Sequence, residues 1–390
     1  MSKLERLIQQ YCPDGVEYVK LDSVANICRG TRVVKSQLSD KGYPVYQNCL
    51  TPMGYFERSN CNAGITFVIC GGAAGNVGYT DVECWAADDC EFIIGGHQVI
   101  NRYIYYYLMT KQNYLLSKVR KASIPRLSPS IIKDLEIPLP PLPVQEEIVR
   151  ILDAFTELQT ELQTELQKRK QQYNYYLDNL LNFNNINRGG YQAEVRWMKM
   201  SDTCLKICSG GTPSRKKAYY FKGGIPWLRT QEVDWNNIYD TEIKITAEAI
   251  KNSSARLIPE NCVIIAMYGA TAGKTGINKI PLTTNQACCN LQINPQIALY
   301  KFVYYWICKN YEKIKSLGQG SQNNINAQIV KDYPIPIPSL VEQQRIVSIL
   351  DRFDTLTNDL TAGLPAEIEK RRQQYEYYRD KLLTFKRKGA

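Results

Sequence analysis

The feature that most constrains the fold is that the chain repeats itself. Residues 132–155 match residues 330–353 without a gap, and the two copies lie 198 positions apart. Residues 168–183 match residues 370–385 at a spacing of 202, so the second copy carries four additional residues between these segments. A unit near 200 residues is far longer than a solenoid repeat. The sequence therefore predicts a tandem duplication, in which each copy is a globular domain followed by a connector.

The two copies agree in their connectors and differ in their globular interiors. The match at a spacing of 198 extends back to Gly71, where residues 73–78 face residues 271–276. Residues 31–66 and 212–260, in contrast, share little. Two similar frames that hold two different binding surfaces would produce this pattern.

Residues 145–183 have the pattern of one long amphipathic helix. Apolar residues recur at every third or fourth position, and 39 residues at about 1.5 Å each make a rod of roughly 58 Å. The prolines between residues 138 and 143 are expected to prevent an earlier start. Residues 343–385 repeat the pattern, and we expect Gly363 and Pro365 to kink this second helix.

Two amphipathic rods in one duplicated chain allow two arrangements. They form an intramolecular antiparallel coiled coil that holds the globular domains apart, or each packs on its own domain as an independent helix. We favour the coiled coil. Its apolar stripe consists of Leu152, Phe155, Leu158, Leu162, Leu166, Leu350, Phe353, Leu356 and Leu360.

The first connector contains three tandem copies of the four-residue unit Thr-Glu-Leu-Gln, at residues 156–167. Each unit lengthens a helix by about 6 Å. DNA rises about 3.4 Å per base pair. The addition or removal of one unit would therefore change the spacing between two DNA half-sites by one or two base pairs. Replication slippage in a tolerant helix would give the same repeat.

Residue counts exclude several kinds of site. The 13 cysteines follow no disulfide or metal-binding spacing and His97 is the single histidine, so we expect neither a zinc site nor histidine-based catalysis. The formal net charge of +10 permits nucleic-acid binding. No signal-peptide core and no membrane-length apolar run are present, which predicts a cytoplasmic protein with no membrane partner.

The glycine-rich segment 269–276 is the one candidate for a nucleotide-binding loop. Three residues separate its first two glycines where a Walker loop has four, and the duplicate segment 71–78 has Asn76 in place of Lys274. We favour a strand followed by a glycine-rich turn, whose amides and Lys274 would meet a DNA phosphate. No amino-methylation motif and no nuclease carboxylate–lysine cluster are recognisable, so no catalytic residue is predicted.

Several segments together carry a family resemblance. They are the Pro-rich stretch that begins at Ile137 and its repeat, Gly210-GTP, Gly223-GIPW, Gly269-ATAGKTG, Thr284-NQAC and Gly320-SQNNIN. In combination with the two long helices, they resemble the specificity subunits of Type I restriction–modification enzymes. The likeness covers nearly the whole chain, and the Thr-Glu-Leu-Gln units resemble the spacer repeats of some members.

The resemblance implies a mixed α/β fold with a pseudo-twofold duplication. Residues 1–142 would be the first target-recognition domain and residues 143–185 the central helical spacer region. Residues 186–340 would be the second target-recognition domain and residues 341–390 the distal helical spacer region. The two long helices would form an antiparallel coiled coil that joins and spaces the domains.

The resemblance also implies the function and the partners. The chain would read a bipartite target on double-stranded DNA and dock two DNA-adenine methyltransferase subunits and motor-nuclease restriction subunits. It would bind no cofactor itself, since S-adenosylmethionine, ATP and Mg²⁺ would belong to the partner subunits. The first domain departs from the family pattern at several motif positions: Asp88-Asp89 stand opposite Gln286-Ala287, and residues 124–126 stand opposite residues 322–324. Different base contacts or sequence drift would each explain this departure.

Base edges are read by Arg, Lys, Asn and Gln, so such residues in the divergent loops are the candidates for DNA contacts. They are Arg29, Arg32, Lys35, Gln47, Asn48, Asn76, Arg126, Arg215, Lys216, Lys217, Arg229, Gln231, Lys274, Gln322, Asn323 and Asn324. Two rival functions remain open at this point. One is a non-enzymatic scaffold whose two domains bind proteins, and the other is a nucleotide-dependent enzyme that uses segment 269–276.

Overall fold

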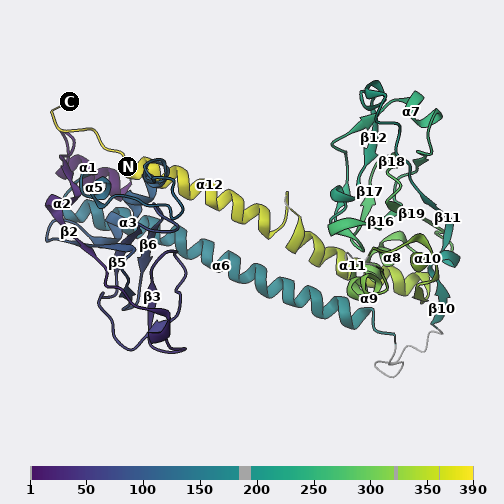
Figure 1. Cartoon of the computed structure of the whole chain (residues 1–390), viewed down its shortest axis with the longest axis horizontal. Coiled ribbons are helices and arrows are strands. Elements are labelled where there is room, and N and C mark those ends of the chain that lie inside the picture. Colours follow the sequence, from purple (N-terminus) through teal and green to yellow (C-terminus); the bar gives the residue numbers. More distant parts are fainter. Residues whose placement is uncertain (1, 184–194, 320–323, 360, 390) are drawn as a thin grey trace. The chain divides into compact units, whose positions relative to one another are not determined.

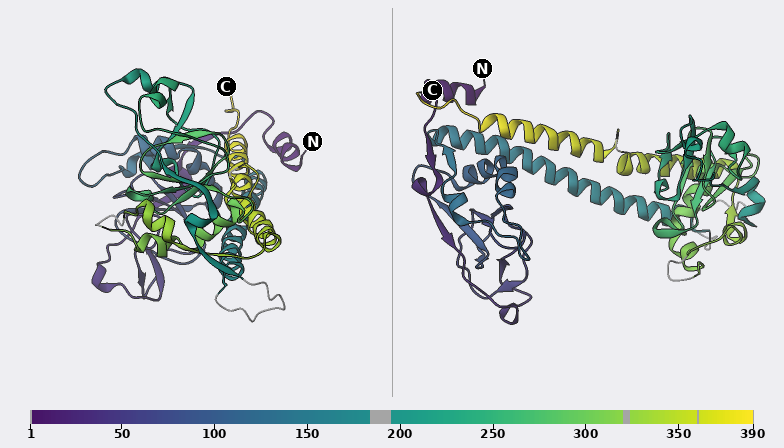
Figure 2. Two further views of the ribbon diagram at one scale, coloured as in Figure 1. Left: turned by 90° about the vertical axis from the view of Figure 1, so that its right-hand side faces the viewer. Right: turned by 45° about the horizontal axis from the view of Figure 1, so that its top comes forward.

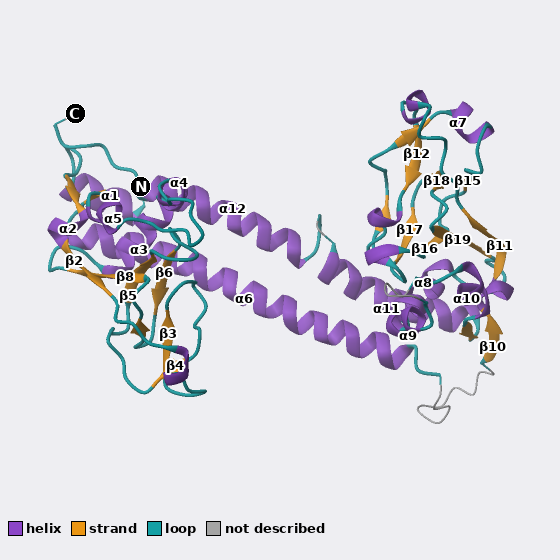
Figure 3. Ribbon diagram, viewed as in Figure 1, coloured by secondary structure: helices purple, strands orange, loops and turns teal. Residues whose placement is uncertain are grey.

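The structure, a computed structural model, describes residues 2–183, 195–319, 324–359 and 361–389. The chain divides into two compact units, which we name unit 1 (residues 1–164 and 366–390) and unit 2 (residues 165–365). Helix α6 (Leu142–Leu180) is continuous from unit 1 into unit 2 (Figure 1). Each unit is a globular α/β body with helices packed against short strands (Figure 3).

Unit 1 contains a four-stranded sheet of order β2-β8-β5-β6, a three-stranded sheet of order β4-β3-β7 and the pair β1-β9. Strands β3 and β7 are parallel, whereas the other pairs are antiparallel. The strands are β1 (Tyr18–Lys20), β2 (Ala25–Arg29), β3 (Tyr43–Tyr46), β4 (Tyr55–Phe56), β5 (Ile65–Ile69), β6 (Val77–Thr80), β7 (Trp85–Ala86), β8 (Cys90–Gly95) and β9 (Glu136–Pro138). The helices are α1 (Lys3–Tyr11), α2 (Leu21–Val24), α3 (Asn101–Thr110), α4 (Gln112–Ser117), α5 (Pro129–Lys133) and α12 (Leu364–Leu382).

Unit 2 contains a five-stranded sheet of order β11-β19-β16-β17-β13, a four-stranded sheet of order β14-β12-β18-β15 and the pair β10-β20. The strands are β10 (Arg196–Lys199), β11 (Cys204–Ser209), β12 (Ile225–Leu228), β13 (Asn237–Ile238), β14 (Lys244–Ile245), β15 (Leu257–Ile258), β16 (Val263–Ala266), β17 (Thr275–Asn278), β18 (Leu282–Thr284), β19 (Cys288–Ile293) and β20 (Pro334–Ile337). The helices are α7 (Ala247–Lys251), α8 (Tyr300–Lys309), α9 (Tyr311–Ser316), α10 (Ala327–Asp332) and α11 (Leu340–Asn358).

The strand order confirms the internal duplication. The order β2-β8-β5-β6 of unit 1 recurs in unit 2 as β11-β19-β16-β17, and the parallel pair β3-β7 recurs as β12-β18. Helix α3 packs on β5 and β6, as α8 packs on β16 and β17. In α3, Tyr103, Ile104, Tyr106, Tyr107 and Leu108 are buried, and they fill the core between helix and sheet. The expected mixed α/β class is therefore confirmed.

One glutamine in each connector fixes its helix to the globular body. Gln145 is fully buried; its Oε1 accepts from the amide of Ile100 at 3.0 Å, and its Nε2 donates to the carbonyls of Gln98 and Pro140. Gln343 of unit 2 makes the same three bonds, with Leu299, Ile297 and Pro338. These bonds satisfy buried backbone groups that no sheet or helix reaches, which explains why both connectors keep this residue.

A second repeated contact lies two turns further along each connector. Asp153 accepts hydrogen bonds from Arg102 and Tyr106 of α3. Asp351 repeats the arrangement on α8, where it accepts from Lys301 and Tyr305 at 2.5 and 2.7 Å. Identical Leu-Asp segments in the two copies therefore serve identical anchoring roles.

In each unit, part of α6 pairs with a helix of the distal segment. The first half of α6 lies antiparallel to α12, with Phe155 stacked on Tyr378 at a centroid distance of 5.5 Å (Figures 1 and 2). Its last turns lie antiparallel to α11, with Tyr176 stacked on Phe353 at 5.0 Å. The expected antiparallel helix pairing is confirmed within each unit.

Two expectations about the helices are wrong in detail. Helix α6 begins at Leu142 rather than residue 145, because Pro143 falls in the first turn, where a missing N–H costs nothing. The distal segment is two helices rather than one kinked helix. The side chain of Asp359 accepts from the amides of Thr361 and Ala362 at 2.7 and 3.1 Å, and this local capping ends α11 before Gly363.

Candidate functional site

Unit 1 carries a glycine-rich loop between β5 and β6. Gly72 and Gly75 have φ angles of +84° and +88°, a conformation that favours glycine. The side chain of Asn76 closes the turn by donating to the carbonyl of Ala73 at 2.9 Å. The amide of Ala73 donates to the carbonyl of Asn48 at 2.8 Å. Two predicted DNA-contact residues, Asn48 and Asn76, therefore belong to one loop assembly.

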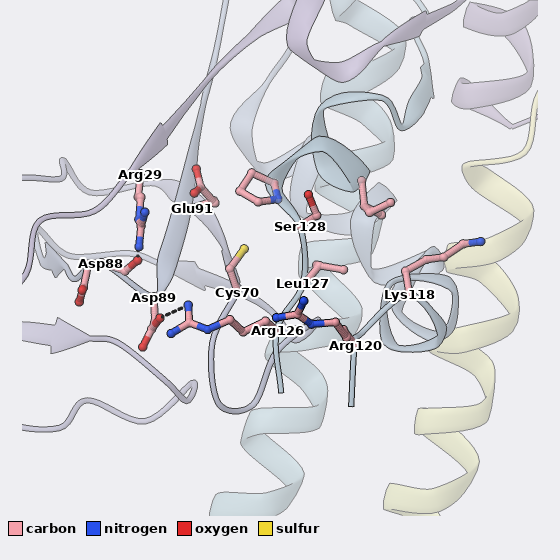
Figure 4. Close-up of a pocket in the computed structure, with 12 residues that line it drawn as sticks. Arg29, Cys70, Asp88, Asp89, Glu91, Lys118, Arg120, Arg126, Leu127 and Ser128 are labelled. Carbon is pink, nitrogen blue, oxygen red and sulfur yellow. Dashed lines mark hydrogen bonds and ion pairs between the residues drawn. The ribbon is translucent and has the colours of Figure 1, made fainter. Parts of the chain in front are cut away.

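A cleft of about 420 Å³ opens beside this loop, on unit 1 (Figure 4). One wall comes from the end of β2, the start of β8 and the residues between β7 and β8, and the other from the segment between α4 and α5. It is lined by Arg29, Cys70, Asp88, Asp89, Glu91, Lys118, Arg120, Arg126, Leu127, Ser128, Pro129 and Ile131. We call it the unit 1 cleft.

Charges in the unit 1 cleft are only partly paired. Arg126 contacts Asp89 at 3.3 Å, and the Nε of Arg29 donates to the carbonyl of Asp88 at 2.9 Å (Figure 4). Glu91 is 4% exposed, and within the described residues no hydrogen bond or ion pair engages its carboxylate. Burial raises the pKa of Glu91, and Arg29, directly opposite on β2, acts against that rise.

The glycine-rich loop of unit 2 lies between β16 and β17, as the sequence predicts. Asn324 accepts from the amide of Gly269 at 3.0 Å, and Thr271 donates to the carbonyl of Thr230 at 2.9 Å. Lys274 forms an ion pair with Asp234 at 2.6 Å. Four loop amides already donate within the chain, so they are not open to a phosphate as expected: those of Gly269, Ala272, Gly273 and Lys274.

Next to this loop, Arg229 bonds to Glu232 and Glu242, and the exposed Gln231 lies beside it. The structure thus gathers Arg229, Gln231, Lys274 and Asn324 around one loop. In unit 1 it gathers Arg29, Asn48, Asn76 and Arg126 in the same way, together with Gln47, whose carbonyl accepts from Cys90.

The remaining candidates lie elsewhere in the fold. Arg32 and Lys35 are exposed on the segment after β2, and Arg215 and Lys216 are exposed on the segment after β11. Lys217 donates to the hydroxyl of Tyr220 at 2.9 Å. No described hydrogen bond or ion pair joins any of these five to the glycine-rich loop of its unit. Gln322 and Asn323 lie outside the described residues.

The expected spacer stripe lies on the paired helices. Leu152 and Leu350 are fully buried against their own units. Phe155 and Phe353 take part in the aromatic stacks between helices. Leu158, Leu162, Leu166 and Leu356 are half-buried, and Leu360 lies outside the described residues.

Sequence reasoning missed three of the charged residues that line the unit 1 cleft: Glu91, Lys118 and Arg120. Glu91 occurs in a run of otherwise apolar strand residues, which is an available signal for an unusual buried charge. Among the described residues, no group of His, Cys, Asp and Glu is placed to hold a metal ion. The helices seen in that same part of the chain include none with the length and apolar character of a membrane span.

Comparison with known proteins adds three findings. Residues 13–172 and 194–370 match the family described as Type I restriction modification DNA specificity domain. The chain is 38% identical over 304 residues to the specificity subunit of the Escherichia coli type I restriction enzyme EcoR124I/EcoR124II, a match that covers 74% of this chain and 72% of that one. It is 31% identical over 402 residues to a Haemophilus influenzae protein named as a type I specificity subunit, with 98% of both chains covered.

Solved structures resemble the fold. The S subunit of a type I restriction–modification system from M. genitalium superposes with a TM-score of 0.67 at 16% identity, over 95% of this chain and 96% of that one. A chain from a study of assembly and conformational transition of the type I system gives a TM-score of 0.62 at 15% identity, over 95% and 98% of the two chains.

Proposed function

Since this chain belongs to the family of type I restriction–modification DNA specificity subunits, we propose that each of its two units reads one half of a split DNA target. Its function is DNA-target recognition, and it is a non-catalytic subunit of a larger system. The observation that carries the two-half proposal is the repeated frame. The same sheet order and the same helix anchors occur in both units, while the loops between them differ.

We assign the reading surfaces to the two glycine-rich loops and the segments packed on them. Each loop gathers arginine, asparagine or lysine side chains suited to phosphates and base edges. The proposed division of the chain is residues 1–142 and 186–340 for the recognition domains. Residues 143–185 and 341–390 are assigned to the spacer.

The proposed partners are double-stranded DNA, two adenine methyltransferase subunits and motor-nuclease restriction subunits, in the cytoplasm. A structural neighbour that belongs to an assembled type I system supports the placement in a complex. S-adenosylmethionine, ATP and Mg²⁺ would be bound by the partner subunits. The spacer helices are the proposed docking surface, through the stripe that includes Leu158, Leu162 and Leu166.

The test is co-expression of this chain with its methyltransferase subunit in a host that lacks adenine methylation, followed by single-molecule sequencing. The proposal predicts methylated adenines in an asymmetric, split motif with a fixed gap. An associated, soluble complex that methylates no specific sequence would contradict it. That result would favour a protein-binding scaffold, which a weak dependence of DNA affinity on salt would also indicate.

A further inference from the structure

The unit 1 cleft has a charge pattern that unit 2 does not share. Seven charged side chains line it, and the duplication supplies an equivalent position for each in unit 2. Those equivalents are all uncharged: Arg29, Asp88, Asp89, Glu91, Lys118, Arg120 and Arg126 correspond to Ser209, Gln286, Ala287, Cys289, Ser316, Gly318 and Asn324. Strand register supports the alignment, since Arg29 opposes Glu91 as Ser209 opposes Cys289.

The frame itself does not require these charges. Unit 2 builds the same strand pairs and the same glycine-rich loop with neutral residues at every one of these positions. Glu91 lines the cleft, and no hydrogen bond or ion pair of the described residues engages its carboxylate, so this acceptor is open to a ligand. An unused acceptor that faces a cleft indicates a ligand that brings a hydrogen-bond donor.

The charges are graded with depth. The acidic groups lie inside, where Glu91 is 4% exposed and the side chain of Asp89 is 18% exposed. The cations lie outside: Arg29, Lys118 and Arg120 are exposed, and the side chain of Arg126 is 49% exposed. Figure 4 shows Glu91 and Asp89 on one side of the cleft, together with Arg29, and Arg120 and Arg126 on the segment between α4 and α5. A ligand with N–H donors at one end and an anion at the other would match this gradient.

We propose that the unit 1 cleft binds a nucleotide. The exocyclic amine of the base would donate to Glu91, and the phosphate would contact Arg120. The volume of about 420 Å³ falls in the range of small-molecule sites and is larger than a single base. The concave shape favours an extruded or free nucleotide over the edge of a stacked base pair, since a buried carboxylate does not reach into a groove.

Base chemistry narrows the ligand further. Guanine, adenine and cytosine each carry an exocyclic amine, whereas thymine presents carbonyl oxygens on both sides of its single N–H. Carboxylate acceptors therefore select an amino-bearing base and repel thymine. The nucleotide that binds the cleft comes from one of two sources. It is a base extruded from the DNA half-site that unit 1 reads, an alternative that rests on the proposed function, or it is a free nucleotide, an alternative that is independent of the proposed function.

The experiment compares the wild-type chain with Glu91→Gln and Arg120→Ala, and uses Glu57→Gln as a matched control, since Glu57 is an exposed carboxylate of unit 1 outside the cleft. All four are assembled with the methyltransferase subunit and their methylated motifs are mapped. If the source is DNA, Glu91→Gln lowers discrimination at one base of one half-site by about tenfold. The other half-site and the gap stay as in the wild type.

In parallel, the full-length chains are melted with and without about 1 mM GMP, AMP, CMP or TMP, since a ligand of the folded state raises the melting temperature. If the source is a free nucleotide, an amino-bearing nucleotide stabilises the wild type and the control but not Glu91→Gln or Arg120→Ala. TMP has no effect. Without ligand, Glu91→Gln should melt no lower than the wild type near pH 7, because it removes a buried unpaired charge.

The outcomes separate the two proposals. A wild-type complex without a split motif overturns the proposed function, and the melting experiment then decides about the cleft alone. A normal wild-type motif that neither variant changes, together with no nucleotide effect on melting, overturns the cleft proposal and leaves the proposed function intact. A loss of specificity in Glu57→Gln as large as in Glu91→Gln also overturns it, because the effect would then not depend on the cleft.

Discussion

At the scale of single residues, the two copies share what holds the frame and differ in what lines the cleft. Gln145 and Gln343 are both fully buried and make the same three bonds to backbone groups. Glu91 and Cys289, at equivalent strand positions, are both buried but differ in charge. Comparison of equivalent positions in the two copies therefore distinguishes structural residues from ligand-binding residues. Structural residues are the same in both copies because both copies have the same frame, whereas ligand-binding residues differ.

The replacement Gln145→Ala is predicted to lower the free energy of unfolding of unit 1 by about 2–4 kcal/mol. It leaves the amide of Ile100 and the carbonyls of Gln98 and Pro140 buried without partners. Urea denaturation measures the change, with Gln163→Ala on the exposed face of α6 within unit 1 as control. A loss of less than about 0.5 kcal/mol would show that water or a shifted backbone replaces these bonds.

The sequence could predict some members of the cleft but not the cleft itself. Arg29 and Arg126 are recognisable as loop cations. Their meeting with Glu91 depends on the pairing of β2 with β8 and on the bridge between Gly71 and Arg126. These pairings join residues 62 and 55 positions apart, and no local pattern encodes them.

At the scale of elements, the sequence predicts those features that depend on interactions between residues close together in the chain. The apolar period of α6 predicts its existence and most of its length, because helix formation depends on near neighbours. The start of α6 at Leu142 depends on the place of Pro143 in the first turn, and the end of α11 at Asn358 depends on the capping by Asp359. The spacing of apolar residues gives no information about either. Strand order is non-local, and the sequence indicates only that short strands occur.

Deletion of one Thr-Glu-Leu-Gln unit from α6 is predicted to shorten the gap between the half-sites by one or two base pairs. Four residues correspond to about 6 Å of helix and to slightly more than one full turn, so the helix face is nearly restored. Within these units Thr160 and Thr164 donate only to backbone carbonyls one turn earlier. Mapping of methylated adenines in the assembled complex measures the gap.

Replacement of the exposed residues Thr160, Glu161 and Gln163 by alanine is the control, because it removes these side chains and keeps both the length and Leu162. Both half-site sequences should stay the same in the deletion and in the control. A deletion that leaves the gap at its wild-type length would show that helix length does not set the spacing.

At the scale of the whole molecule, the duplication is the property that the sequence predicts most securely. Sheet order, helix anchors and family matches over residues 13–172 and 194–370 all divide the chain into two similar parts. Two similar frames therefore carry two different reading surfaces, and the connectors keep their anchoring residues in both copies.

The measurement that tests this claim most directly uses a chain in which residues 17–139 are replaced by a second copy of residues 196–337. Both segments run between equivalent positions of the repeat. The variant is assembled with the methyltransferase subunit and its methylated adenines are mapped. The account predicts a motif built from two copies of the half-site that unit 2 reads, with the other half-site gone. An associated complex that still methylates the original asymmetric motif would contradict the assignment of one half-site to each unit.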